Sequence, residues 1–447
     1  MRFAKRCSGG LVILDRHGFA RQVGLSTIGL IVTKAAAAGG GIIVARLLGP
    51  ADKGIHALFV VAVGLAGIVG TCGLEYWLAR NVAETGSRAA ARPIIARHLR
   101  VTGVLGVVAV SVLMVGAIFG PVPRSAVVAI PFTWVTVFTM VHLAVLGGER
   151  RMARVAVATS VGAILYLLAV LALFQVDAAS VTLVLAAATV STLVAGIIAA
   201  SGVRACLERP AVAVSGRIAL RFGAPLAASE VVTFAAQRTD LLVLGVLATS
   251  TDLGRYAVAL TLVELLLIVP NGVSQVLLPH VAADQNQRPT ATLIRIATAA
   301  LAGPVAVLLV VGDAVVGAVF GDGFRSGSLL LPLLAFGTIP LAAWKLLVAD
   351  LVGRGLISVR LRSAAAGFFV GAAACVGLVP SLGPNGAALG SGAGSLAAFA
   401  VALRTWRIEG GGGAVTLFVL QRSDIAAVRR GIREAVGRGG DVEVSFR

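Results

Sequence analysis

The sequence is poor in charged and aromatic residues for its length. Of its 447 residues, 13% are charged and 5% are aromatic, whereas an ordinary soluble domain is about 25% charged. A soluble chain of this length would form about two or three domains, and this one has too few polar residues to cover their surfaces. With 58% hydrophobic residues, the composition excludes a soluble globular protein and indicates apolar surfaces that face lipid.

Cysteine is scarce, and the sequence has no motif of nucleotide or metal chemistry. Cys72 and Cys375 fall in apolar segments and Cys7 and Cys206 in basic ones, which predicts neither a disulfide nor a zinc site. There is no Walker loop, no HExxH and no Gly-x-Ser-x-Gly in a fitting context. We therefore expect a protein that is not an enzyme and that uses no catalytic residue, metal or cofactor.

A net charge of +18 is typical of nucleic-acid-binding proteins, but the positions of the charges argue against a nucleic-acid partner. Most Lys and Arg residues lie in both tails and in every second gap between apolar stretches of roughly 20 residues. The cations of the intervening gaps are Lys53, Arg124, Arg255 and Arg325. By the positive-inside rule, this alternation predicts a multi-pass protein of the bacterial cytoplasmic membrane with both termini in the cytoplasm.

The apolar stretches predict about twelve transmembrane helices. The first half has predicted spans near residues 24–48, 55–78, 101–119, 126–146, 155–174 and 181–200. The second half has predicted spans near residues 222–247, 256–278, 296–316, 328–348, 364–379 and 386–403. Strands of a membrane barrel would be about half as long. The expected fold class is therefore an all-α polytopic membrane protein.

An internal repeat relates the two halves. A displacement of about 200 residues aligns Asp52 with Asp252. The same displacement aligns Gly54 with Gly254, and a matching apolar series follows. Parallel repeats of this kind predict two pseudo-symmetric six-helix lobes around a central cavity. The expected domains are a cytoplasmic N-tail, an N-lobe, a cytoplasmic linker, a C-lobe and a basic cytoplasmic C-tail, over residues 1–23, 24–202, 203–218, 219–405 and 406–447.

Cations within the predicted spans are the candidate substrate-binding residues. A charged residue at the centre of a membrane helix costs about 3 kcal/mol on insertion scales, so its presence requires a cavity or a partner. Lys34 lies deep in the first span and Arg238 deep in the seventh, its repeat equivalent. Together they would form a cavity site suited to phosphate or diphosphate. Arg46, nearer the outer end of the first span, is a third candidate.

Each cation also has a structural explanation, and the sequence does not decide between the two. Arg238 has Asp240 and Glu230 on its own helix as possible ion-pair partners. Lys34 would pair with an acid elsewhere in the chain. Arg46 would extend its guanidinium to the membrane interface. Lys345, near the cytoplasmic end of its span, is best explained in the same way.

The acids in or near the spans are candidates for ion coupling or for fixed counter-ions. A carboxylate in a partly desolvated cavity can exchange protons during alternating access. The candidates are Asp240, Glu230, Glu264 and Glu75. Pro270 and Gly272 interrupt the eighth span and form the predicted hinge, because such breaks let a membrane helix bend.

Several segments resemble the polysaccharide-transporter (Wzx-type) flippases of the multidrug/oligosaccharidyl-lipid/polysaccharide (MOP) exporter superfamily. They are ARLLGPADKGIHAL from Ala45, QRTDLLVLG from Gln237, GRYAVA from Gly254, IVPNGVSQVLLPHVA from Ile268 and GPNGAALGSG from Gly383. The resemblance covers most of residues 24–405. It departs at His56, where the family commonly has an aromatic residue. It implies a V-shaped cavity lined by basic residues, a role that Arg238 and Lys34 would take here.

The resemblance implies translocation of lipid-diphosphate-linked oligosaccharide of the undecaprenyl-diphosphate type by alternating access. Membrane lipids and the glycan polymerase or glycosyltransferase machinery would be its partners. The alternative is a proton- or sodium-coupled multidrug exporter of the MATE-like branch, which predicts a cavity dominated by acids and aromatic residues. A membrane-bound glycan polymerase would need a large catalytic outer loop, and every predicted outer loop is short.

Overall fold

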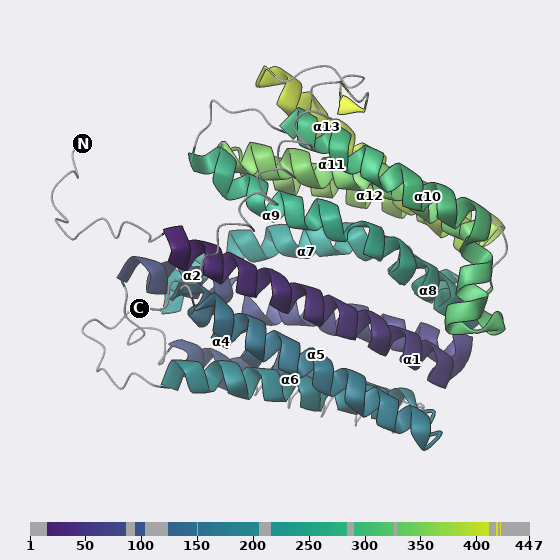
Figure 1. The fold of residues 1–447 in the computed structure, drawn as a ribbon, viewed down its shortest axis with the longest axis horizontal. Helices are drawn as coiled ribbons and strands as arrows, with labels where there is room; N and C mark the ends of the chain where they lie inside the picture. The colour runs from purple at the N-terminus through teal and green to yellow at the C-terminus, as the bar shows by residue number, and fades with distance from the viewer. Residues whose placement is uncertain are drawn as a thin grey trace, which may run out of the picture. The chain divides into compact units, whose positions relative to one another are not determined.

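A computed structural model describes residues 16–85, 94–102, 124–149, 151–204, 216–283, 290–325, 329–410, 417–418 and 421. Within these ranges the chain forms helices joined by short turns, and no strand is present. The helices are α1 (Arg16–Thr71), α2 (Leu74–Thr85), α4 (Arg124–Gly148), α5 (Met152–Gln175), α6 (Val181–Arg204), α7 (Gly216–Leu247), α8 (Ser250–Leu266), α9 (Ile268–Ala283), α10 (Thr290–Phe320), η1 (Asp322–Phe324), α11 (Leu330–Gly353), α12 (Ser358–Leu382) and α13 (Pro384–Ile408) (Figure 1). The predicted all-α fold class is confirmed.

Helix α1 contains the first predicted span and most of the second. The two parts meet at Gly49, which has a φ of 69° and precedes Pro50. Glycine adopts this left-handed conformation without steric cost, and proline cannot continue the helical hydrogen bonding. The second predicted span, over residues 55–78, is too long, because α1 ends at Thr71 and positive φ angles at Cys72 and Gly73 turn the chain into α2.

The remaining spans agree with the prediction to within a few residues at most ends. Helices α4, α5 and α6 match predicted spans of the first half, while most of the span at 101–119 lies outside the described residues. In the second half, α7 begins before its predicted span, and the span at 256–278 is divided into α8 and α9. Eight described helices are long and apolar enough to cross a membrane, or nine if α8 and α9 count as one span. In this number α1 counts as one helix, although it contains the first predicted span and most of the second. The predicted number of twelve is therefore approximate.

The described residues group into two compact units. The first unit contains those within 1–40, 70–176 and 182–225, and the second contains those within 41–69, 177–181 and 226–447. Residues 41–69, which were predicted to belong to the N-lobe, thus group with the second unit. The predicted lobe boundaries remain a prediction.

The repeated Asp-x-Gly motifs meet inside the second unit, where α1 crosses α8. A Cβ atom on Gly54 would clash with the carbonyl oxygen of Ser250. Reciprocally, a Cβ atom on Gly254 would clash with the carbonyl oxygen of Pro50. Because Pro50 and Ser250 are related by the same displacement as the two glycines, the contact has the reciprocal form of a two-fold axis. This is the geometry that the internal repeat predicts.

Close packing of small residues also positions α13 against α12 in the second unit. Gly394 of α13 lies so near Gly367 that a Cβ atom on it would be 2.7 Å from the Gly367 carbonyl oxygen. On the next turn of α12, Gly371 faces the same stretch of α13. Small residues allow membrane helices to approach this closely. The contact fixes the height of Ser391 and Ser395, which line a pocket described below.

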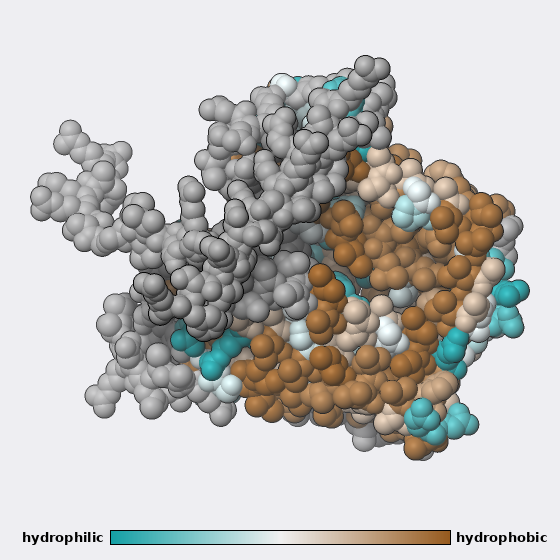
Figure 2. All heavy atoms as spheres, viewed as in Figure 1, coloured by the Kyte–Doolittle hydropathy of each residue, from teal (hydrophilic) through white to brown (hydrophobic). Residues whose placement is uncertain are grey.

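The outer surface of the described helices is mostly apolar. Hydrophobic side chains cover most of the described surface in the view of Figure 2, and polar residues gather toward its edges. Large exposed side chains such as Val310, Phe369 and Val190 have few neighbours within their unit. A surface of this kind suits lipid and would be unstable in water. The chain is therefore a multi-pass membrane protein.

Candidate functional site

The second unit contains a buried acid, Asp240 of α7, with a side chain that is 2% exposed. The phenolic O–H of Tyr256 donates to Asp240 Oδ2 at 2.5 Å, and the backbone N–H of Leu241 donates to Oδ1 at 2.8 Å. The hydroxyl of Ser391 is a further hydrogen-bond partner of the carboxylate. All three partners are neutral. These hydrogen bonds hold the carboxylate in place but do not neutralise its charge.

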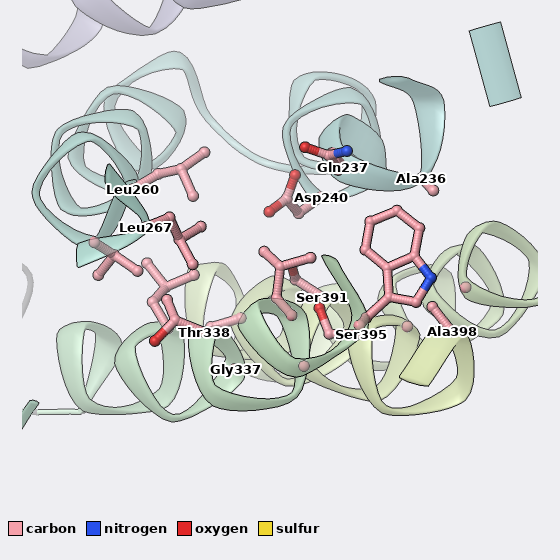
Figure 3. Close-up of a pocket in the computed structure, with 18 of the residues that line it drawn as sticks. Ala236, Gln237, Asp240, Leu260, Leu267, Gly337, Thr338, Ser391, Ser395 and Ala398 are labelled. Atoms are coloured by element: carbon pink, nitrogen blue, oxygen red, sulfur yellow. The ribbon is translucent and has the colours of Figure 1, made fainter. Parts of the chain in front are cut away.

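Asp240 lines a small pocket, here called the acidic pocket, of about 80 Å³. Gln237 and Asp240 of α7 face Ser391 and Ser395 of α13 across it, and Thr338 of α11 lies on a third side (Figure 3). Its other walls are Glu264 of α8 and apolar side chains and glycines of α7, α8, α11, α12 and α13. A carboxylate surrounded by hydroxyl and amide oxygens, with room for an ion or water, can bind a small cation.

An ion pair joins α7 to α8 beside this pocket. Arg238 Nη1 donates to Glu264 Oε1 at 2.6 Å, with the two side chains 27% and 44% exposed. Glu264 also lines the acidic pocket. The ion-pair partner of Arg238 is therefore Glu264 rather than Glu230 or Asp240, although the charge of Arg238 also acts on Asp240. The actual partner lies on the neighbouring helix, which helical spacing along α7 could not reveal.

A larger pocket of about 320 Å³, here called the basic pocket, lies among α7, α9, α11 and α12. Its charged lining residues are Lys345 of α11 and Arg360 at the start of α12. Lys345 Nζ donates to Asn271 Oδ1 at 2.9 Å, and Arg360 Nη2 donates to Glu230 Oε2 at 2.5 Å. Glu230 is therefore a partner of Arg360 rather than of Arg238. The side chain of Lys345 forms a hydrogen bond with α9 and lines a pocket. The sequence-based interpretation, that Lys345 extends to the membrane interface, therefore does not account for its position.

The two pockets share part of their lining. Gln237 and Trp344 belong to both, so polar side chains continue from one pocket to the next. On α7, Glu230, Thr233, Gln237 and Asp240 recur at helical spacing and form one polar stripe. This stripe is a sequence signal for the site. The charge and the depth of each residue taken singly do not reveal it.

The predicted hinge lies next to an observed bend. Helices α8 and α9 meet at Leu267 and are bent by 50°. Pro270 follows in the first turn of α9, where a proline needs no helical hydrogen-bond partner for its nitrogen, and Gly272 begins the second turn. A Cβ atom on Gly272 would meet no atom within 4 Å, so packing does not require glycine there. Hinge motion at these residues remains a prediction.

The other predicted residues lie elsewhere. Lys34 is exposed on α1 in the first unit, and no side-chain partner for it occurs among the described residues. Arg46 donates through Nε to the Val319 carbonyl and through Nη2 to the Ala318 carbonyl, both at 2.7 Å. These are the last carbonyls of α10, where a cation stabilises the helix end. Arg46 thus has a structural contact within the second unit.

Glu75 lies in the first turn of α2, in the first unit. An acid at a helix N-terminus interacts favourably with the helix dipole. The structure therefore brings together Asp240, Glu264 and Arg238, and separately Glu230 with residues that were not predicted. A site shared by Lys34 and Arg238 remains a prediction.

The family of the chain follows from sequence comparison. A family model described as "Polysaccharide biosynthesis protein" matches residues 19–283, which is more than half of the chain. The chain belongs to this family. A comparison with curated proteins found no match to the chain.

Solved structures show the fold that this polysaccharide biosynthesis family protein shares with transporters of known structure. An inward-facing multidrug resistance MATE family transporter of the MOP superfamily matches with a TM-score of 0.65 and 18% identity, over 86% of this chain and 98% of that one. The lipid II flippase MurJ in an inward closed conformation matches with a TM-score of 0.64 and 10% identity, over 86% and 87%. A MOP superfamily transporter from Pyrococcus furiosus matches with a TM-score of 0.57 and 17% identity, over 87% and 94%.

These matches confirm the resemblance inferred from the sequence motifs. The polysaccharide biosynthesis family protein has a MOP superfamily fold. At such low identities the likeness concerns the fold, so the substrate must be argued from this chain's own residues.

Proposed function

We propose that this protein is a flippase that moves a lipid-diphosphate-linked oligosaccharide across the bacterial cytoplasmic membrane for the synthesis of a cell-surface polysaccharide. The observation that carries the proposal is membership of a polysaccharide biosynthesis family on a MOP superfamily fold. The protein would act by alternating access, opening a cavity to each side of the membrane in turn. Both termini would lie in the cytoplasm, as the distribution of Lys and Arg predicts.

The substrate class agrees with the cations that lie within membrane helices. A diphosphate in a low-dielectric cavity requires positive partners, and arginine binds it through two parallel hydrogen bonds. Arg238 and Lys34 are proposed substrate contacts. Arg238 would exchange Glu264 for the diphosphate, because the ion pair is partly exposed and costs little to open. Arg46, held by α10, would contribute to the closed outer end of the protein instead.

The energy for transport would come from an ion that binds Asp240. Its carboxylate is buried, lines a pocket with hydroxyl and amide oxygens, and is bonded only to neutral groups among the contacts described above. Of the four predicted acids, Glu230 and Glu264 are engaged by arginines. Asp240 is therefore the proposed coupling residue, with either sodium or a proton as the ion.

Deletion of the gene tests the function. Cells that lack the protein should lose the surface polysaccharide and accumulate its lipid-linked precursor in the cytoplasmic leaflet, where it stays inaccessible to a glycosidase added outside. Replacement by the intact gene should restore export, while an Arg238→Gln, Lys34→Gln double variant that inserts normally should not. Unchanged polysaccharide in the deletion strain would refute the proposed function.

The similarity to a MATE family transporter supports a second candidate, an ion-coupled multidrug exporter. This candidate would use the acidic pocket in the same way but would take cationic drugs as substrates. It predicts that deletion lowers resistance to lipophilic cations and leaves the polysaccharide intact. The same deletion strain therefore distinguishes the two functions.

A further inference from the structure

The basic pocket has the lining expected for an amphiphilic anion. Its polar lining residues include Lys345, Arg360, Asn271 and Ser274, and its apolar lining residues include Leu278, Val348 and Val352. On α11, Lys345, Val348 and Val352 recur at helical spacing, so the cation and the apolar side chains share one face of that helix. A ligand that contacts both kinds of side chain carries negative charge next to hydrocarbon.

The donors of this pocket suit phosphate oxygens. A lysine ammonium has three donors and an arginine guanidinium has five. Both groups therefore can bind an anion in addition to, or in place of, their present partners Asn271 and Glu230. The indole of Trp344 donates to Ser363 at 2.9 Å, which fixes the wall next to Lys345. Because these donors are already held in position, their side chains lose less conformational entropy when the ligand binds.

We propose that Lys345 and Arg360 form a binding site for the diphosphate of an isoprenoid carrier, with the first isoprenoid units against Leu278 and Val352. This inference deepens the proposed function and rests on it. It also moves the first diphosphate contact from Lys34 and Arg238 to Lys345, which was explained from the sequence by an interfacial position, and to Arg360, which was not considered there.

The position of the pocket agrees with loading from the cytoplasm. In the predicted orientation, Lys345 lies near the cytoplasmic end of its span and Arg360 lies just outside the next one. The substrate of a flippase in this family would be assembled on the cytoplasmic leaflet, so a site at that end meets it first. Gln237 and Trp344 connect this site to the acidic pocket, where the coupling ion would bind.

Glu230 would compete with the diphosphate for the guanidinium of Arg360. Its carboxylate holds the Arg360 guanidinium at 2.5 Å in the absence of ligand. A diphosphate that binds Arg360 must displace this carboxylate or share the guanidinium with it. Removal of the charge at Glu230 should therefore strengthen diphosphate binding, whereas loss of Lys345 or Arg360 should weaken it.

Binding of geranylgeranyl diphosphate to the full-length protein in nanodiscs of zwitterionic lipid tests the site. Wild type should bind the diphosphate and should bind geranylgeraniol, which lacks the phosphates, at least tenfold more weakly. Lys345→Gln and Arg360→Gln should each weaken binding about tenfold, the loss of one charge-assisted contact. Glu230→Gln should tighten it severalfold. Arg362→Gln is the matched control, because Arg362 is exposed on the same helix and points about 200° away from Arg360.

Vesicles of phosphatidylglycerol identify the source of the phosphate. If they compete as well as the isoprenoid diphosphate does, the pocket is a general phospholipid site and the proposal is overturned. Equal binding by wild type and by the Lys345→Gln, Arg360→Gln double variant would also overturn it. In that case normal polysaccharide export, with loss of export in the deletion strain, would leave the proposed function standing. Failure of the deletion test would reject the function independently of any binding result.

Discussion

Two neighbouring pockets of the second unit differ in the sign of their charge. The acidic pocket contains Asp240, held by the Tyr256 hydroxyl and a backbone N–H. The basic pocket contains Lys345 and Arg360, each bonded to an oxygen of another helix. The two share Gln237 and Trp344 as walls. Asp240 thus lines one pocket and the two cations line its neighbour, and no ion pair joins Asp240 to Lys345 or Arg360 among the described contacts.

The difference indicates two ligands rather than one. If Asp240 served only to stabilise the fold, an ion pair with a cation would lower the cost of burying its charge. Instead, Asp240 is held by neutral donors, which favours a small cation. The cations line the larger space, which favours an anion with a hydrocarbon tail. Since Gln237 and Trp344 lie between, occupation of one pocket can alter the other through a shared side chain.

Asp240→Asn should have the largest effect and tests whether the two pockets have separate ligands. Asparagine keeps the size of the side chain; its oxygen can accept from the Leu241 N–H while its amide N–H donates to the Tyr256 hydroxyl, so the fold should persist. Loss of the charge should reduce ion-driven export about 100-fold, while binding of isoprenoid diphosphate changes less than about twofold. Export from vesicles with imposed sodium and proton gradients, and binding in nanodiscs, are the measurements.

The matched control for that variant is Asp252→Asn. Asp252 accepts from the Thr249 hydroxyl at 2.7 Å at the start of α8, outside both pockets. Its replacement should lower stability slightly and leave export and its ion dependence intact. A drop in diphosphate binding as large as the drop in export for Asp240→Asn would show that the pockets act as one site.

Gln237→Leu should have the next largest effect and tests the shared wall. Leucine is similar in size but offers neither donor nor acceptor, so both pockets lose a polar partner. We expect about a tenfold loss in ion-driven export and a loss of similar size in diphosphate binding. Titration of diphosphate at high and low sodium measures the coupling. An effect confined to one property would mean that Gln237 does not link the pockets.

Much of the fold could be predicted from the sequence, because lipid imposes simple rules on it. Span length follows from membrane thickness, and charge alternation follows from the orientation of loops. The breaks were harder to predict. Cys72 and Leu267 are apolar and give no compositional signal, yet helices end beside both. The turn at Cys72 depends on positive φ angles and on tight contact of Gly73 with Gly223.

The candidate site could be predicted only in part. Asp240 stood out because a buried charge in a membrane helix needs an explanation. Lys345 and Arg360 did not, since each lies near a helix end, where a cation is ordinary. Their convergence on one pocket depends on the packing of α11 against α9 and α12. For the same reason the pairing of Arg238 with Glu264, between α7 and α8, could not be read from spacing along one helix.

Arg238→Gln and Glu264→Gln test the rim of the acidic pocket, with smaller expected effects. The pair is partly exposed, so its coupling energy in a double-mutant cycle should be below about 1 kcal/mol. Glu264→Gln releases the guanidinium and should raise diphosphate affinity about twofold, whereas Arg238→Gln should lower it about threefold. A loss above tenfold for Arg238→Gln would make Arg238, rather than Lys345 and Arg360, the main diphosphate contact.

Arg46→Gln should have the smallest effect on either pocket, because its contacts lie at the end of α10. The guanidinium gives up two hydrogen bonds of 2.7 Å to the carbonyls of Ala318 and Val319. We expect a loss of about 1 to 2 kcal/mol in the free energy of unfolding, measured by thermal unfolding in detergent, with diphosphate binding unchanged. Arg404→Gln, at an exposed position of α13, is the control and should leave stability within about 0.5 kcal/mol of wild type. If Arg46→Gln weakened diphosphate binding as much as Arg360→Gln, the cations would act as one extended surface, and the assignment of opposite charges to two separate ligands would fail.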